Sequence, residues 1–268
     1  LLYLNNEKMI SFSIDNINFN KEFLPLNPNG LTFTAFKDGE IISKETYYSI
    51  GGGFIIQEED SLVDEIEVTK QNLPYPINRA VELDRYCIRE KLSISEIVFQ
   101  NELVINTEEK INSELHRIWT EMLECIYVGC HTKGILPGGL NVKRRAFDTH
   151  AKLIKSSTYT NPNEWITAIR SSEVKFREIL KWVSCFALSV NEVNASLGRV
   201  VTAPTNGSAG VIPAVLMYYL VIENHEADFE HIKKFLLTAS EIGSLFKKNA
   251  TISAAMGGCQ AEIGVSSA

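Results

Sequence analysis

The strongest constraint on the fold is a nearly continuous apolar run around position 180. Between residues 174 and 197, apolar side chains recur on most faces of a helix. They are Phe176, Ile179, Leu180, Val183, Phe186, Ala187, Val190 and Val193. Such a helix is stabilised by contact with other protein elements on most of its sides, because water solvates none of these side chains well. The sequence therefore predicts a central buried helix.

Polar groups gather where this predicted helix ends. Asn191, Glu192, Asn194 and Arg199 lie beside Gly198. Polar groups at the end of a buried helix need hydrogen-bond partners, because burial without a partner costs free energy. This pattern indicates a functional site near that end.

The rest of the chain after residue 78 is also helical in pattern. One helix opens at Asn106-Thr-Glu-Glu with capping residues, carries an apolar face at spacings of three and four, and is expected to end at Gly129. Two further helices are predicted at about 209–222 and 228–247, and 134–140 is predicted to be a loop.

The first 56 residues favour β-structure. The segments 31–36 and 41–48 flank Lys37-Asp-Gly-Glu40, which is typical of a hairpin, and Ile10–Ile14 alternates apolar and polar residues as a strand does. Residues 57–77 are acidic and end in Pro74-Tyr-Pro76, which is typical of a linker. We predict an α+β chain: a truncated small β-rich domain (1–56), a linker (57–77) and an all-helical domain (78–268).

Composition excludes several classes of function. Lys plus Arg is 26 and Asp plus Glu is 33, so the net charge is −7 and no nucleic-acid partner is expected. No apolar run reaches the roughly 20 residues that span a bilayer, so no membrane association is expected. The five cysteines form no disulfide pattern, which indicates a reducing cytoplasm.

Several residues could carry chemistry, and each has a plainer interpretation. Thr202–Gly210 is a polar loop before a helix, suited to binding a carboxylate or phosphate, or simply to capping the helix. Lys247 could be a desolvated base, or a solvated cation at a helix C-terminus. Cys259 follows two glycines, which suits a metal or cluster ligand but also a buried free thiol. The spacing of Cys125 and Cys130 favours structural thiols, and the histidines are expected to be solvated: His116, His150, His225 and His231.

Long motifs in colinear order resemble the iron–sulfur L-serine dehydratases. The two longest are Asn191–Pro213 (NEVNASLGRVVTAPTNGSAGVIP) and Lys248–Ser253 continuing to Gly258–Gly264 (GCQAEIG). Shorter ones are Thr46–Phe54 (TYYSIGGGF), Gln100–Glu102 (QNE) and Leu136–Ala146 (LPGGLNVKRRA). The resemblance runs from about residue 20 to the end of the chain.

The resemblance implies a β domain of regulatory or substrate-binding type joined to a helical catalytic domain. It implies that L-serine is deaminated to pyruvate and ammonia by a [4Fe-4S] cluster acting as Lewis acid on the leaving hydroxide, while a base removes the α-proton. By the matching motifs, Cys259 is the first cluster ligand, and Thr205, Asn206 and Ser208 line the substrate. Arg145, with Arg144, is expected either to position a carboxylate or to tie down the Pro-Gly-Gly loop. Lys247 and Asn249 are the candidate catalytic residues.

The other two cluster cysteines are expected beyond Ala268, so we expect this chain to be an inactive piece of a longer homodimeric enzyme. Two alternatives remain open. One is a pyridoxal-phosphate lyase with Lys247 as Schiff base and Thr202–Gly210 as phosphate cup. The other is a non-catalytic amino-acid-binding module, with its function confined to residues 1–56.

Overall fold

The structure is a computed structural model of the 268-residue chain. It describes residues 2–4, 7–26, 28–51, 54–59, 73–155, 158–196, 199, 206–250, 257–258, 260–261 and 264. The chain divides into two compact units, one of Leu1–Ile50 with Phe54–Asp64 and one of Gly51–Gly53 with Glu65–Ala268. The predicted linker, 57–77, stays a prediction, because residues 60–72 lie outside the described ones.

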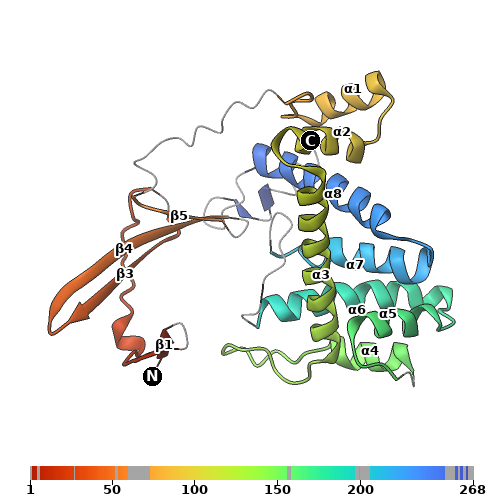
Figure 1. The fold of residues 1–268 in the computed structure, drawn as a ribbon. Coiled ribbons are helices and arrows are strands. Elements are labelled where there is room, and N and C mark those ends of the chain that lie inside the picture. Colours follow the sequence, from red (N-terminus) through yellow and green to blue (C-terminus); the bar gives the residue numbers. More distant parts are fainter. Residues whose placement is uncertain are drawn as a thin grey trace. The chain divides into compact units, whose positions relative to one another are not determined.

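The first unit is built from short antiparallel pairings (Figure 1). Strands β1 (Leu2–Leu4) and β2 (Lys8–Ile10) form an antiparallel pair. Strands β3 (Gly30–Lys37), β4 (Glu40–Gly51) and β5 (Phe54–Gln57) form a three-stranded sheet in the order β3-β4-β5. A 3₁₀ turn (Ile14–Asn16) lies between β2 and β3.

The predicted hairpin is confirmed, and its turn shows why the sequence revealed it. Strands β3 and β4 pair antiparallel, and both turn residues have positive φ, 51° at Asp38 and 85° at Gly39. This is the conformation that an Asp-Gly pair favours between two strands. The predicted strand at Ile10–Ile14 is wrong beyond Ile10, because Ser13 instead caps the 3₁₀ turn with its side chain.

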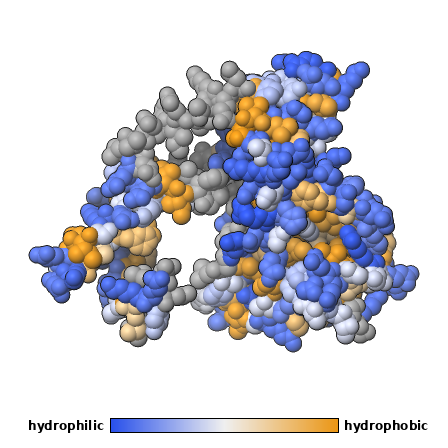
Figure 2. Space-filling model, in the orientation of Figure 1, coloured by the Kyte–Doolittle hydropathy of each residue, from blue (hydrophilic) through white to orange (hydrophobic). Residues whose placement is uncertain are grey.

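The hairpin carries exposed apolar side chains. They are Leu31, Phe33, Phe36, Ile41 and Ile42. Figure 2 shows hydrophobic residues next to the hydrophilic tip of the hairpin. Tyr48 and Thr46, by contrast, are buried. Burying exposed apolar surface of this kind against another protein surface lowers the free energy.

The second unit consists of helices (Figure 1). They are α1 (Ala80–Glu90), α2 (Ile94–Ile105), α3 (Glu108–His131), α4 (Ala146–Ile154), α5 (Pro162–Arg170), α6 (Phe176–Asn194), α7 (Val211–Tyr218) and α8 (Phe229–Asn249). A π-helical turn (Tyr219–Glu223) continues α7. The α+β prediction is therefore confirmed. Within the described part of the chain, no helix has both the length and the apolar composition that crossing a bilayer requires.

Helix α6 is the central element that the sequence predicts, with one correction. It packs against α3, α4 and α7, and its buried stripe includes Trp182, Phe186 and Val190 at helical spacing. Phe176 and Leu180, however, are 90% and 76% exposed. Both precede Trp182, the first buried residue of the helix, so the expectation of all-round burial is wrong for the first turns of the helix.

Helix α3 begins where the sequence predicts and ends later. The Thr107 hydroxyl caps its start by accepting from the backbone N–H of Lys110 (3.3 Å). The helix runs through Gly129 to His131, so the predicted end at Gly129 is wrong. A Cβ on Gly129 would lie 2.4 Å from the carbonyl oxygen of Ser189 in α6. This glycine therefore permits close packing of two helices and does not end one.

Candidate active site at the C-terminal end of helix α6

A buried carboxylate joins the end of α6 to the start of α4. Glu192 is 3% exposed and accepts hydrogen bonds from the backbone N–H groups of Arg145 (2.6 Å) and Ala146 (3.3 Å). Helix α4 has no side-chain cap of its own. Glu192 therefore satisfies the first N–H groups of α4 and complements the positive end of its dipole. The start of α4 therefore supplies the hydrogen-bond donors that this polar group at the end of α6 requires.

Arg144 is held in the same cluster. Its side chain is buried, with an exposed fraction of 9%, and Nη2 donates to the hydroxyl of Ser196. Ser196 in turn donates to the carbonyl oxygen of Glu192 (2.5 Å), and the Arg144 backbone N–H donates to the carbonyl of Gly134 (2.9 Å). The guanidinium is thus fixed between the loop after α3 and the end of α6.

The predicted loop at 134–140 is confirmed and extends over residues 132–145. Ile135 and Lys143 form an isolated antiparallel bridge, and the N–H of Leu136 donates to the carbonyl of Val142 (2.8 Å). Gly134 and Gly138 have φ values of 115° and 110°, a region that favours glycine. The bridge fixes both ends of the loop and so the place where Arg144 leaves it.

The start of α7 approaches the same helix. A Cβ on Gly210 would lie 2.3 Å from the carbonyl oxygen of Ala187, so the backbone of Gly210 packs directly on α6. Ala187 precedes Glu192 by five residues, which is about 8 Å along the helix axis. Asn206 is exposed and Ser208 half-buried in the turn before α7. The predicted substrate residues Asn206 and Ser208 therefore belong to a segment that meets α6 near its polar end.

Two predicted site residues cannot be placed. Thr205 and Cys259 lie outside the described residues. Three of the described cysteines are core residues: Cys125 and Cys130 in α3 and Cys185 in α6 are buried. The sulfurs of Cys130 and Cys185 are 4.0 Å apart. Burial raises the pKa of Cys125 to about 11, so its thiol is protonated at neutral pH.

The end of α8 makes contacts of its own. Lys247 is exposed in the last turn, where a cation interacts favourably with the helix dipole. The Asn249 amide donates to the carbonyls of Asn78 (3.1 Å) and Leu245 (2.9 Å), and Lys248 Nζ donates to the carbonyl of Ile77 (2.6 Å). These bonds tie the end of α8 to the segment before α1. They are not contacts with the polar end of α6.

The predicted solvation of His150 is wrong. It is 3% exposed in the core, where the indole N–H of Trp165 donates to its Nε2 (2.9 Å). Burial, with a smaller contribution from the charge of His131, lowers the pKa of His150 to about 4. His116, His225 and His231 are exposed, as predicted.

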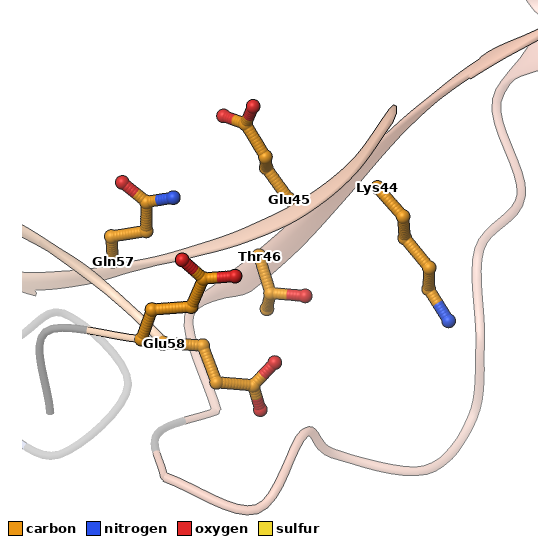
Figure 3. A pocket seen from close by; sticks show the side chains of 6 residues that line it. Lys44, Glu45, Thr46, Gln57 and Glu58 are labelled. Atoms are coloured by element: carbon orange, nitrogen blue, oxygen red, sulfur yellow. The ribbon is translucent and has the colours of Figure 1, made fainter. Parts of the chain in front are cut away.

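The first unit has a pocket of about 200 Å³ on the sheet. Lys44, Glu45 and Thr46 of β4 and Gln57 and Glu58 at the end of β5 line it (Figure 3). The Lys44 and Glu45 side chains point to opposite sides of β4 in Figure 3. These two side chains therefore do not converge on one point of the pocket.

Sequence reasoning found this region but missed two of its features. It named Arg145 together with Arg144, but it did not distinguish the exposed Arg145 from the buried Arg144. It also gave Glu192 no role in capping α4. The signal for Glu192 was present, because an acidic residue at the polar end of an apolar helix must find donors.

Fold and site together define an α+β chain in which a helical unit gathers polar groups around the end of one central helix. The chain belongs to the serine dehydratase family. Residues 89–268 match the family of serine dehydratase alpha chains, and residues 1–60 match that of serine dehydratase beta chains. This confirms the resemblance seen in the sequence motifs.

Known relatives match nearly the whole chain. L-serine dehydratase of Haemophilus influenzae is 40% identical over 261 residues, which cover 97% of this chain and 54% of that protein. L-serine dehydratase 2 of Escherichia coli is 39% identical over 267 residues, covering 99% of this chain and 55% of that protein. L-serine dehydratase of Helicobacter pylori is 37% identical, covering 100% and 56%. The chain spans about half the length of these relatives.

Proposed function

We propose that this protein deaminates L-serine to pyruvate and ammonia by β-elimination. The observation that carries the proposal is the match of nearly the whole chain to relatives named L-serine dehydratase, at 37–40% identity in the three cases above. The packing on α6 supports it, because Arg144 of the 132–145 loop bonds to Ser196 after the end of α6, and Gly210 at the start of α7 packs on Ala187 of the same helix. Both segments carry residues of the family motifs.

We propose a [4Fe-4S] cluster as the cofactor, with Cys259 as one of its ligands. The support is the chemistry of the sequence around it: a thiolate after two glycines lets backbone and cluster approach closely. When bound, such a cluster supplies a Lewis acid for the departing hydroxyl group. Among the described residues, no three His, Cys, Asp or Glu side chains gather to hold a metal ion. The described part of the chain thus supplies no ligand set, and Cys125, Cys130 and Cys185 serve the core.

The polar segments of this chain bind and orient the substrate in our proposal. Thr205, Asn206 and Ser208 contribute hydroxyl and amide groups beside the start of α7, where backbone N–H groups favour a carboxylate. An arginine of the 144–145 pair supplies the opposite charge. Glu192 holds the start of α4 in place through the N–H groups of Arg145 and Ala146.

We propose Lys247 and Asn249 as catalytic residues because they directly precede the segment that leads to Cys259. Lys247 is exposed and Asn249 uses its amide nitrogen to hold the segment before α1. In the proposal, Lys247 takes the α-proton of serine.

We place the reaction in a reducing cytoplasm, which is supported by free thiols at Cys87, Cys125, Cys130 and Cys185. We also propose a homodimer, supported by the exposed apolar side chains of the β3–β4 hairpin, which a second subunit would cover. Sedimentation equilibrium of the protein expressed from its complete coding sequence tests the dimer: a concentration-independent monomer contradicts it.

The cofactor is tested by reconstituting the same full-length protein anaerobically with iron and sulfide. We expect equal amounts of iron and acid-labile sulfide, and visible absorption typical of a cluster. Cys259→Ala is expected to lose most of both. Cys87→Ala, which removes a half-buried thiol of α1, is the matched control and is expected to keep them. Equal cluster content in Cys259→Ala and the parent contradicts the assignment.

A further inference from the structure

One guanidinium nitrogen of Arg144 is buried and has no hydrogen-bond partner among the described residues. The Arg144 side chain is 9% exposed, and its Nη1 makes no hydrogen bond to any residue that the structure describes. Among the described residues, no carboxylate lies within 4.0 Å of this guanidinium, and Ser196 is its one side-chain partner. A buried cation with no counter-charge is unfavourable, because it loses its hydration and no opposite charge compensates for that loss.

The neighbouring carboxylate, Glu192, does not act as the counter-charge of Arg144. Both oxygens of Glu192 are directed at the backbone N–H groups that begin α4. Ser196, which holds Nη2 of Arg144, bonds to the main-chain carbonyl of Glu192. The backbone of Arg144 is fixed in turn by Gly134. The arrangement therefore orients the guanidinium while leaving one arm unused, which is how a preorganised anion-binding group is built.

A second buried polar atom that has no hydrogen-bond partner within the described ranges lies in the last turns of α6. It is Oδ1 of Asn191, the residue before Glu192. In the part of the chain that the structure describes, a cationic donor and a neutral acceptor are thus both without partners near this end of the helix. An α-amino acid carries the complementary pair, a carboxylate that accepts and an ammonium that donates. Arginine is the side chain best suited to the carboxylate, because its planar fork can donate two parallel hydrogen bonds.

We propose that Arg144, through its unpaired Nη1, binds the α-carboxylate of the amino-acid substrate. The proposal rests on the proposed function and decides between the two arginines of the pair. Arg145 is exposed, and its ordered contact is the backbone N–H that donates to Glu192. Its side chain keeps its hydration and needs no ligand.

The test compares ligands with and without the carboxylate on the reconstituted full-length protein. Initial rates of pyruvate formation give the apparent affinity for L-serine as its KM. Competition with L-serine gives the affinity for L-serinamide, which keeps the ammonium and hydroxyl groups but lacks the negative charge. The parent is expected to favour L-serine by about 10-fold or more, the value of a charge-assisted hydrogen bond. Equal affinity of the parent for both ligands contradicts the proposal without any substitution.

The variants then assign the preference to one residue. Arg144→Gln is expected to weaken L-serine binding about 10- to 100-fold and serinamide binding less than about 3-fold. Arg145→Gln, the matched control on the adjacent residue, is expected to preserve the preference. Arg144→Lys keeps the charge without the planar fork and is expected to retain part of the preference, which keeps the test decisive if the glutamine variant does not fold.

The outcomes separate the two proposals. An equal loss for both ligands in Arg144→Gln indicates a structural role and overturns the inference, as does a loss of the preference in Arg145→Gln instead. Failure of the parent protein to bind L-serine at all contradicts the proposed function itself.

Discussion

The buried imidazole of His150 predicts a specific pH dependence of stability. His150 is 3% exposed among Trp165, Trp182 and His131, and Trp165 donates to its Nε2. An indole nitrogen only donates, so a proton on Nε2 would break this bond and leave the indole N–H buried without a partner. Burial accounts for most of the lowering of the His150 pKa to about 4. The folded state therefore holds the ring neutral.

The magnitude follows from the two states of the ring. In the unfolded chain an imidazole takes up its proton near pH 6.5, whereas the folded protein resists this down to about pH 4. The unfolded state binds more protons in this range, so stability rises with pH and is lost on acidification. For this pair of pKa values, the contribution of His150 to the free energy of unfolding falls by about 2 kcal/mol between pH 7 and pH 5.

Urea unfolding at pH 7, 6 and 5, followed by tryptophan fluorescence, measures this effect, since Trp119, Trp165 and Trp182 are all buried reporters. His150→Gln retains an acceptor for Trp165 but cannot be protonated. Its decline between pH 7 and pH 5 is expected to be about 2 kcal/mol smaller than that of the parent. His225→Gln, at an exposed position, is the control and is expected to follow the parent. Parallel curves for the parent and His150→Gln refute the reasoning.

Two further predictions concern the contacts of α6, and chemical unfolding measures both. Gly129→Ala is expected to cost about 1–3 kcal/mol, because its Cβ would meet the Ser189 carbonyl at 2.4 Å. The control Gly243→Ala, in open space on α8, is expected to be neutral or stabilising by up to about 1 kcal/mol; equal effects of the two would contradict the close-packing argument. Glu192→Ala is expected to cost at least about 1.5–3 kcal/mol, because it strips the carboxylate from the buried start of α4. An Ala variant as stable as the parent would show that Glu192 does not hold α4.

Local signals in the sequence predicted the elements that local chemistry decides. Asp38-Gly39 supplied the two positive φ values of the hairpin turn, and Thr107 supplied the cap of α3. These features depend on a few adjacent residues, so the sequence carries them directly.

Contacts between distant segments decided the features that the sequence did not reveal. Gly129 is typical of a helix end, and only the approach of Ser189 explains a glycine inside α3. His150 has charged neighbours in sequence, yet Trp165 and Trp182 enclose it in the fold. The choice between Arg144 and Arg145 likewise depends on which side chain turns toward α6, and adjacent identical residues give no local signal of that.

The same reasoning applies to the site as a whole. The motifs covered Leu136–Ala146, the end of α6 and the segment before α7. In the fold, Arg144 bonds to Ser196 after the end of α6, and Gly210 at the start of α7 packs on Ala187 of that helix. The hydrogen bonds of Asn249 and Lys248 to the segment before α1 could not be predicted from the sequence, because each joins residues that lie 171 positions apart in the chain.

The most direct test of the account is product formation from L-serine. The full-length protein, reconstituted anaerobically with iron and sulfide, is incubated with L-serine, and pyruvate and ammonia are measured before and after the iron is removed by a chelator. The account predicts pyruvate and ammonia in equal amounts, lost with the iron and unaffected by borohydride, which traps a lysine Schiff base. Turnover that survives iron removal, or borohydride trapping of a lysine adduct, would contradict it, as would the absence of pyruvate from a protein that carries the cluster.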